Sequence, residues 1–340
     1  MDVLLNVLRT LLQNDETACS VPATDWRSAA HLSITCTEVR KVWETGKIAE
    51  PLVIAISPDT DIMHVLSFRT WVDTVETTVP RGRSMVGAAA ADGCIYVIGG
   101  QIDEMDVTLV DAYDMEMRIW SSLSRMRTAR SLPQVLVMNK CLYVLGGERI
   151  RHPRSSSVER LHLATCVWTI QPQLPLVIPS LSGSSVVGIA RSIYALGYRR
   201  NNARQYHDSI SLHLVELPPS EMETYGTWLD LSPIPLRLRQ PSTMFNVVSI
   251  GDDIWTFCVD GRIGKFDTHT LEWNDNFANT VRLVFCRNVA INAQIYIFGL
   301  NYGVQEFNPE TGVARFYERM LPAFANRIFS TVARRRIQPA

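Results

Sequence analysis

The sequence predicts an all-β fold in which six copies of a unit of about 50 residues form the blades of a closed β-propeller. Three observations support this prediction. Short apolar runs separated by turn residues fill the chain from Ile48 onward. A strand-like run ends on a pair of glycines at Gly99-Gly100 and again at Gly146-Gly147, which is 146 − 99 = 47 residues later. A tryptophan follows each glycine pair at a similar distance, so the whole unit repeats.

The number of blades follows from aligning the copies on their tryptophans. The aligned positions are Trp71, Trp120, Trp168, Trp228 and Trp273, with Phe316 as the sixth. Six copies predict six four-stranded blades around a central channel. The longest interval between tryptophans is absorbed by polar and proline-bearing loop material at residues 199–227. Because an indole ring buries a large area, we expect these tryptophans to fill the space between adjacent blades.

Closure of the ring is predicted from the two ends of the repeat region. The first copy lacks the apolar strand that elsewhere precedes the diglycine strand. Residues 327–333 have the pattern of that missing strand. We therefore expect them to pair beside residues 51–57, which would join the first and last blades and protect their edges.

Composition limits the function classes. The chain has 340 residues, a formal net charge of −1 and seven cysteines with no C-x-x-C pair. This balance argues against a nucleic-acid binder, and the scattered cysteines indicate a reducing compartment. The N-terminus lacks the charge pattern of a signal peptide, and no apolar run is long enough to cross a bilayer. We expect a soluble protein of the cytoplasm, the nucleus or both, with no membrane or nucleic-acid partner.

The repeat resembles a known family. Besides the glycine pairs and tryptophans, an aspartate or asparagine recurs at Asp114, Asp267 and Asn308. These marks resemble the kelch repeat over residues 48–333, and they imply a kelch-type propeller spanning residues 47–340. Kelch propellers are usually binding platforms, although the family includes a copper oxidase and a sugar epimerase.

Residues 1–46 predict a separate helical segment. Leucines at helical spacing indicate an amphipathic helix over residues 2–13, and Thr24 or Asp25 is suited to cap a second helix. The segment resembles an F-box at these positions: Leu4, Leu5, Val7, Leu8, Leu32, Ser33, Cys36 and Arg40. An alternative is that the helices only cap the propeller.

Together the resemblances imply a non-catalytic substrate-recognition subunit of an SCF-type E3 ubiquitin ligase. The expected partners are a Skp-type adaptor, the cullin ligase core and a target protein on the propeller. Adaptor binding would use a leucine set that lies in a groove of the partner. This set is Leu4, Leu5, Leu8, Leu11 and Leu32. Target specificity would come from loops 101–109, 148–157 and 199–210, because loops on a rigid scaffold carry recognition.

Catalytic and metal-binding patterns are absent from the sequence. No nucleophile elbow, phosphate-binding loop or zinc spacing occurs, so we expect no enzyme activity and no cofactor. His162 and His213 alternate with apolar residues and are interpreted as exposed strand positions rather than metal ligands. Asp103, Glu104 and Asp106 share a loop that either is solvated or holds a cation.

Arginines recur at one place in the repeat. Arg83 and Arg130 each lie sixteen residues before the first glycine of a pair, and further candidates occur near corresponding points. The expected target-binding set is Arg83, Arg130, Arg239, Arg287 and Arg327. Repeat symmetry would carry these side chains to one mouth of the channel, and related kelch adaptors use such arginines to recognise acidic peptides. Arginine suits this task because its planar fork binds carboxylates. The alternative is that each arginine pairs with a neighbouring acid.

Two other functions remain open from the sequence. One is a kelch scaffold without a ligase role, whose N-terminal helices pack on the propeller. The other is a kelch-fold enzyme that acts on a sugar or small acid, which would require a convergent polar cluster in the channel.

Overall fold

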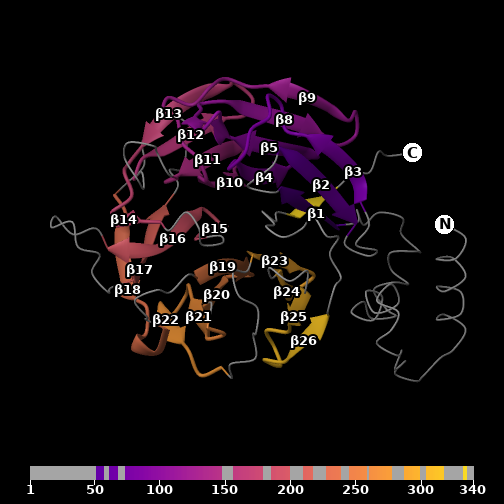
Figure 1. Ribbon diagram of the computed structural model, residues 1–340. Helices are drawn as coiled ribbons and strands as arrows, with labels where there is room; N and C mark the ends of the chain where they lie inside the picture. Colours follow the sequence, from indigo (N-terminus) through magenta and orange to yellow (C-terminus); the bar gives the residue numbers. More distant parts are fainter. Residues whose placement is uncertain are drawn as a thin grey trace, which may run out of the picture.

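The computed structural model describes the repeat region and confirms a six-bladed β-propeller (Figure 1). The described residues are 51–56, 61–67, 73–147, 156–178, 185–199, 210–216, 227–238, 245–258, 260–277, 287–298, 304–317 and 332–334. The expected F-box-like segment at residues 1–46 and its five leucines lie outside these ranges.

Apart from the yellow C-terminal strand β27, the first three blades occupy the indigo-to-magenta part of Figure 1. Blade 1 contains β27 (Val332–Arg334), β1 (Pro51–Ile56), β2 (Ile62–Ser67) and β3 (Asp73–Thr78). Blade 2 contains β4 (Gly87–Ala91), β5 (Cys94–Ile98), β8 (Val110–Asp114) and β9 (Ile119–Ser122). Blade 3 contains β10 (Gln134–Met138), β11 (Cys141–Leu145), β12 (Val158–His162) and β13 (Val167–Gln171). A two-stranded hairpin, β6 (Gln101–Ile102) and β7 (Met105–Asp106), leaves blade 2.

The remaining three blades complete the ring. Blade 4 contains β14 (Leu176–Val177), β15 (Val186–Ile189), β16 (Ser192–Arg199), β17 (Ile210–Glu216) and β18 (Leu229–Pro233). Blade 5 contains β19 (Phe245–Ile250), β20 (Asp253–Cys258), β21 (Ile263–Asp267) and β22 (Glu272–Asn274). Blade 6 contains β23 (Arg287–Ile291), β24 (Gln294–Phe298), β25 (Val304–Phe307) and β26 (Ala314–Tyr317). A 3-10 turn, η1 (Leu236–Leu238), links blades 4 and 5.

The strands pair antiparallel within each blade, and the innermost strand is the first one given above except in blade 4, where it is β15. The inner strands contact one another in the circular order β27, β4, β10, β15, β19, β23 and back to β27. This continuous contact makes the blades one closed ring around a channel, as the six-fold repeat predicted.

The predicted closure is confirmed. β27 pairs antiparallel with β1, with Leu52 opposite Ala333 and Val53 opposite Val332. The pairing strand is Val332–Arg334, at the end of the predicted range 327–333. Figure 1 shows the yellow C-terminal strand beside the indigo β1. The chain ends therefore share a sheet, and the first blade receives its inner strand from the far end of the sequence.

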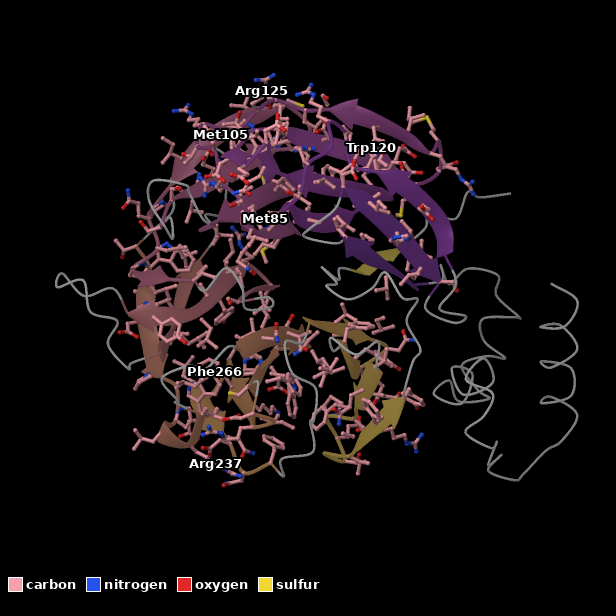
Figure 2. The ribbon with its side chains drawn as sticks, in the orientation of Figure 1. Met85, Met105, Trp120, Arg125, Arg237 and Phe266 are labelled. Atoms are coloured by element: carbon pink, nitrogen blue, oxygen red, sulfur yellow. The ribbon has the colours of Figure 1, made fainter. Side chains whose placement is uncertain are left out.

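The core lies between the blades, where apolar faces of neighbouring sheets meet. One cluster joins blades 2 and 3 through residues such as Ile98 and Leu142, both fully buried. Four of the predicted tryptophans pack into such interfaces, which confirms their expected role. They are Trp120, Trp168, Trp228 and Trp273. Their positions on the outer strands are illustrated by Trp120 in Figure 2.

Two details differ from the sequence-based expectation. Blade 4 has a fifth strand because β16 continues through Gly197, and its last residues, Tyr198 and Arg199, pair with β14. His213 is not exposed: only 3% of its surface is accessible, and its Nε2 atom lies 4.0 Å from an Asp230 oxygen. Leu212 and His213 are consecutive and both buried, and the pairing of β17 with β18 shifts its register between them, so simple alternation does not hold at this point. Within the described residues, no helix is long and apolar enough to span a membrane.

Candidate functional site

The candidate site is the loop face of the propeller around blades 2 and 3. We call loop face the end of the blades that carries residues 99–109 and 123–133, and turn face the opposite end, which carries the tight turns at 92–93, 115–118, 139–140 and 163–166. The two faces are distinct because residues 92–93 and 99–100 flank opposite ends of the same strand, β5. The loop at 101–109 predicted to carry specificity lies on the loop face.

The two glycine pairs shape this face because the backbones approach closely. Gly99 and Gly100 have φ angles of 62° and 95°, in the left-handed region that favours glycine. A Cβ atom on Gly99 would lie 2.3 Å from the carbonyl oxygen of Arg130, and one on Gly100 would lie 2.4 Å from that of Ser84. The Gly100 N–H donates to the Arg130 carbonyl at 3.0 Å. The glycines therefore let the loop of blade 2 touch the entry to blade 3.

Arg83 is enclosed where this loop begins and ends. Its side chain is fully buried, and Nη1 donates to the carbonyl oxygens of Gly99 and Leu109, at 3.1 Å each. Nη2 forms an ion pair with Asp111, whose second oxygen accepts from Ser122 at 2.6 Å. Burial lowers the pKa of the Arg83 guanidinium, while Asp111 raises it. One side chain thus ties together both ends of the 99–109 loop.

Arg130 repeats this arrangement in blade 3. Nη1 donates to the carbonyl oxygens of Gly146 and Ser157, at 2.9 Å each, and Nη2 pairs with Glu159 at 2.5 Å. The Glu159 carboxylate also accepts from the backbone N–H groups of Arg127 and Thr128. Buried charges persist when paired and hydrogen-bonded in this way. These contacts fix the loop that enters blade 3 to the third strand of that blade.

The surroundings of these two arginines differ from those expected of residues that bind a target directly. Both side chains are 0% exposed, and their nitrogen atoms already donate within the protein. Each arginine pairs with a nearby acid, Arg83 with Asp111 and Arg130 with Glu159. This is the alternative that the sequence left open. Direct binding of a target by either guanidinium would require these internal bonds to break. We therefore assign Arg83 and Arg130 to the architecture of the loop face.

The other expected target-binding arginines are placed only in part. Arg287 begins β23, where its backbone pairs with Phe298. Arg239 and Arg327 lie outside the described residues, as do loops 148–155 and 200–209. A role for these three arginines in target binding stays a prediction.

The acid partners Asp111 and Glu159 were not anticipated from the sequence. Both are buried, with 2% exposure, and each is the second residue of the third strand of its blade. Each follows its arginine by 28 or 29 residues, since 111 − 83 = 28 and 159 − 130 = 29. The repeat predicts that these strand positions face inward. An acidic residue at such a position could therefore have indicated an internal partner for the arginine.

A hairpin formed by β6 and β7 lies on the loop face. Gln101 exchanges two backbone hydrogen bonds with Ser84, and its Nε2 atom donates to Asp106 at 3.1 Å. Met105, labelled in Figure 2, is 64% exposed at the hairpin. Asp103 and Glu104, which precede it in the sequence, are also exposed. The hairpin is held in place and presents an apolar side chain flanked by carboxylates.

The chemistry of the described residues gives no sign of a metal centre. They contain no group of three histidine, cysteine, aspartate or glutamate side chains placed to hold a metal ion. The recurrent Asp114, Asp267 and Asn308 instead have a turn-forming role, since each accepts hydrogen bonds from two backbone N–H groups just ahead of it. Asp103, Glu104 and Asp106 belong to the hairpin.

Comparisons with known proteins agree with this architecture. Residues 82–127 and 129–175 each match the family model described as Kelch motif, and these segments cover blades 2 and 3. The solved structure of YjhT has a TM-score of 0.60 and 12% identity, and the match covers 79% of this chain and 94% of that one. The fold defines a six-bladed β-propeller. Within this propeller, blades 2 and 3 match the kelch motif.

Curated relatives resemble parts of the chain. Kelch repeat protein C2 of vaccinia virus (strain Western Reserve) is 30% identical over 171 residues, which are 50% of this chain and 30% of that protein. An F-box/kelch-repeat protein of Arabidopsis thaliana is 37% identical over 89 residues, or 25% of this chain and 19% of that protein. The match thus spans less than a third of the length of each of these relatives.

Proposed function

We propose that this chain is a non-catalytic protein-interaction subunit that binds a target protein through the loop face of its propeller. The observation that carries the proposal is the hairpin β6–β7, where Met105 is 64% exposed on a backbone fixed by hydrogen bonds to Ser84. A backbone that is fixed in advance loses little conformational freedom on binding, which favours affinity. The acidic residues beside it favour a partner with an apolar pocket and a basic rim.

The finer proposal is that the chain is the substrate receptor of an SCF-type ubiquitin ligase. The support is the resemblance of residues 1–46 to an F-box and the similarity of part of the chain to an F-box/kelch-repeat protein of Arabidopsis. The leucine set would bind a Skp-type adaptor, and the cullin core would follow through that adaptor. The protein would then act in the cytoplasm, the nucleus or both.

Target binding is tested with two methionines of equal exposure on opposite faces. Met105 on the loop face and Met117 on the turn face are each 64% exposed. Tagged full-length chains carrying Met105→Ser or Met117→Ser are purified from cells, and bound proteins are quantified by mass spectrometry. A target of the loop face should be depleted by Met105→Ser and retained by Met117→Ser. The reverse pattern would contradict the proposed face.

The ligase role is tested by adaptor binding. The full chain should bind a purified Skp adaptor, and the double variant Leu5→Asp, Leu8→Asp should not, because charges in the leucine set oppose burial in a groove. Leu271→Asp, an exposed leucine in a turn of blade 5, is the matched control and should bind normally. If the folded full chain fails to bind, the second candidate, a kelch interaction scaffold without a ligase role, replaces the first.

A further inference from the structure

A second candidate surface lies on the turn face, between blades 2 and 3. A cavity of about 350 Å³ opens there between the turns that follow β4 and β8 in blade 2 and those that follow β10 and β12 in blade 3. Small-ligand pockets have volumes of about 300–1,000 Å³, so the cavity is large enough for a side chain with its flanking backbone. It is separated from the loop face by the length of β5.

The charges around the cavity are predominantly negative. Asp92, Asp114 and Glu116 line it from blade 2, and Lys140 lines it from blade 3. Three carboxylates and one ammonium group leave a formal charge of −2 around the opening, although the whole chain carries only −1. Grooves with one sign of charge attract ligands of the opposite sign, so this cavity favours a cation.

The arrangement suits an extended organic cation better than a metal ion. The described residues contain no cluster of three potential metal ligands, so the three carboxylates are too widely spaced to converge on one ion. Between them the walls include Tyr96 and the apolar side chains of Met115 and Leu163. Lysine and arginine side chains combine an apolar stem with a charged head and match such a surface. Tyr96, which is 8% exposed, contributes an aromatic side chain to this wall, and aromatic rings favour nearby cations.

The walls of the cavity are fixed before any partner arrives. In blade 2 the Met115 N–H donates to the Gly93 carbonyl at 3.1 Å, and in blade 3 the Leu163 N–H donates to the Lys140 carbonyl at 3.0 Å. Asp114 holds its own turn by accepting from the backbone N–H groups of Glu116 and Met117. These bonds join the two turns of each blade, so the opening keeps its shape.

We propose that this cavity is a docking site for a basic segment of a partner protein, and that it receives a lysine or arginine side chain. The stem would lie against Tyr96 and Met115, and the charged head would face Asp92 and Glu116. This proposal is independent of the hairpin and of the F-box, because its residues lie at the other end of the blades.

The test uses the full-length chain and two labelled nonapeptides, one with alternating glycine and lysine and one in which glutamine replaces every lysine. Fluorescence anisotropy at low salt should show binding of the lysine peptide only, weakening as salt rises because the ion pairs are screened. Failure of the lysine peptide to bind, or equal binding of the glutamine peptide, would overturn the proposal.

Two double variants separate the site from general attraction by charge. Asp92→Asn with Glu116→Gln removes two carboxylates from the cavity, and Asp103→Asn with Glu104→Gln removes two from the hairpin on the other face. Both change the net charge equally. The first should weaken binding about tenfold, as expected for two exposed ion pairs, and the second less than about twofold. Equal weakening would show that the peptide senses only total charge and would refute the site.

Ala164→Phe tests the cavity without altering charge. Ala164 is an exposed turn residue that lines the cavity, so a phenyl ring there should block entry while the fold is maintained, as checked by thermal melting. Unchanged peptide binding by this variant would contradict insertion into the cavity. Lys140→Gln is an independent check, because removing the competing cation should tighten binding about threefold. Weaker binding by Lys140→Gln would count against the proposed charge recognition.

Discussion

Blades 2 and 5 solve the same problem of backbone geometry with different residues. In blade 2 the N–H of Gly99 donates to Leu109, and the Gly99 carbonyl accepts from the buried side chain of Arg83. In blade 5 the N–H of Cys258 donates to Arg262, and the Cys258 carbonyl accepts from the backbone N–H of Gly261 at 2.9 Å. The connection between β20 and β21 in blade 5 is short, and its own backbone, through the Gly261 N–H, supplies the donor to the Cys258 carbonyl.

The comparison explains why the arginine and the glycine pair vary among the copies. In the longer loop 99–109 the ends meet through the Gly99 N–H, and the Arg83 side chain donates to the carbonyl groups of both Gly99 and Leu109. Such carbonyl groups are costly to bury unpaired. The short connection of blade 5 needs no such arginine, and Ser242 stands sixteen residues before Cys258. The positive φ of 88° moves to Gly261, so the strand end accepts a cysteine. Blades 2 and 5 thus differ in the donor to the carbonyl at the strand end, which is an arginine side chain at the long loop and a backbone N–H at the short one.

Opening the ring to which both blades belong should cause the largest loss in the free energy of unfolding. Truncation after Leu321 removes β27, which pairs with β1 and contacts the inner strands β4 and β23. The loss exposes the edge of β1, and we expect destabilisation by about 5 kcal/mol or more. Urea unfolding followed by circular dichroism measures the change. Truncation after Arg336 retains β27 and is the control; equal stability of the two truncated chains would contradict closure by this strand.

Removal of the buried arginine should be the next largest effect. Arg130→Met leaves the Glu159 carboxylate buried without its charge partner, and breaking a buried pair on one side costs about 3–5 kcal/mol. Arg262→Met in blade 5 removes an arginine from a more exposed pair with Asp260 and should cost about 1 kcal/mol or less. Chemical unfolding of both variants gives the two free energies. Similar losses would show that the blades do not differ in this respect.

Alanine substitutions at two glycines with positive φ distinguish the cost of backbone strain from the cost of a close approach between chain segments. Gly99→Ala places a Cβ atom 2.3 Å from the Arg130 carbonyl, whereas Gly251→Ala in blade 5, at φ 58°, meets nothing within 4 Å. We expect about 1 kcal/mol of strain at Gly251, and about 2–3 kcal/mol at Gly99 because the chains must also move apart. Thermal melting of the two variants tests the difference. A larger effect at Gly251 would rule out close approach as the dominant factor.

The smallest expected difference concerns the indole N–H groups. Trp120 donates from Nε1 to Thr77 of blade 1 at 3.2 Å, whereas the buried Nε1 of Trp273 has no hydrogen-bond partner. Trp→Phe should cost about 1 kcal/mol more at Trp120 than at Trp273, since only the first loses a hydrogen bond. Both variants lose the same ring area, so each is the control for the other. Equal unfolding free energies would contradict a stabilising bond to Thr77.

The repeat made much of the fold predictable, because strands of similar pattern in one chain must bury their faces against one another. The spacing of Trp120 and Trp168 gave the blade period, and the missing first strand gave the closure that β27 provides. The fifth strand of blade 4 was not predictable, because Gly197 resembles the glycines that end strands in blades 2 and 3. In the fold it lies within β16, opposite Ser211.

The candidate site was less predictable than the fold. Symmetry placed Arg83 and Arg130 correctly at equivalent points, but equivalence does not decide whether a side chain points to solvent or to the interior. The positions of Asp111 and Glu159 on the third strands decide that, and they lie 28 and 29 residues away in sequence. The cavity between blades 2 and 3 is lined by four turns that are far apart in the sequence. No local sequence pattern predicts that these turns lie side by side.

By itself the sequence determined the number of blades, the strands that form them and the end-to-end closure, because these depend on periodic burial of apolar residues. Only the tertiary structure decided which charged side chains form buried ion pairs and which lie at the surface. That decision depends on distances between segments of different blades, such as the 2.5 Å between Arg130 and Glu159. Burial makes such a pair part of the architecture, whereas Asp92 and Glu116 stay at the surface and are available to a partner.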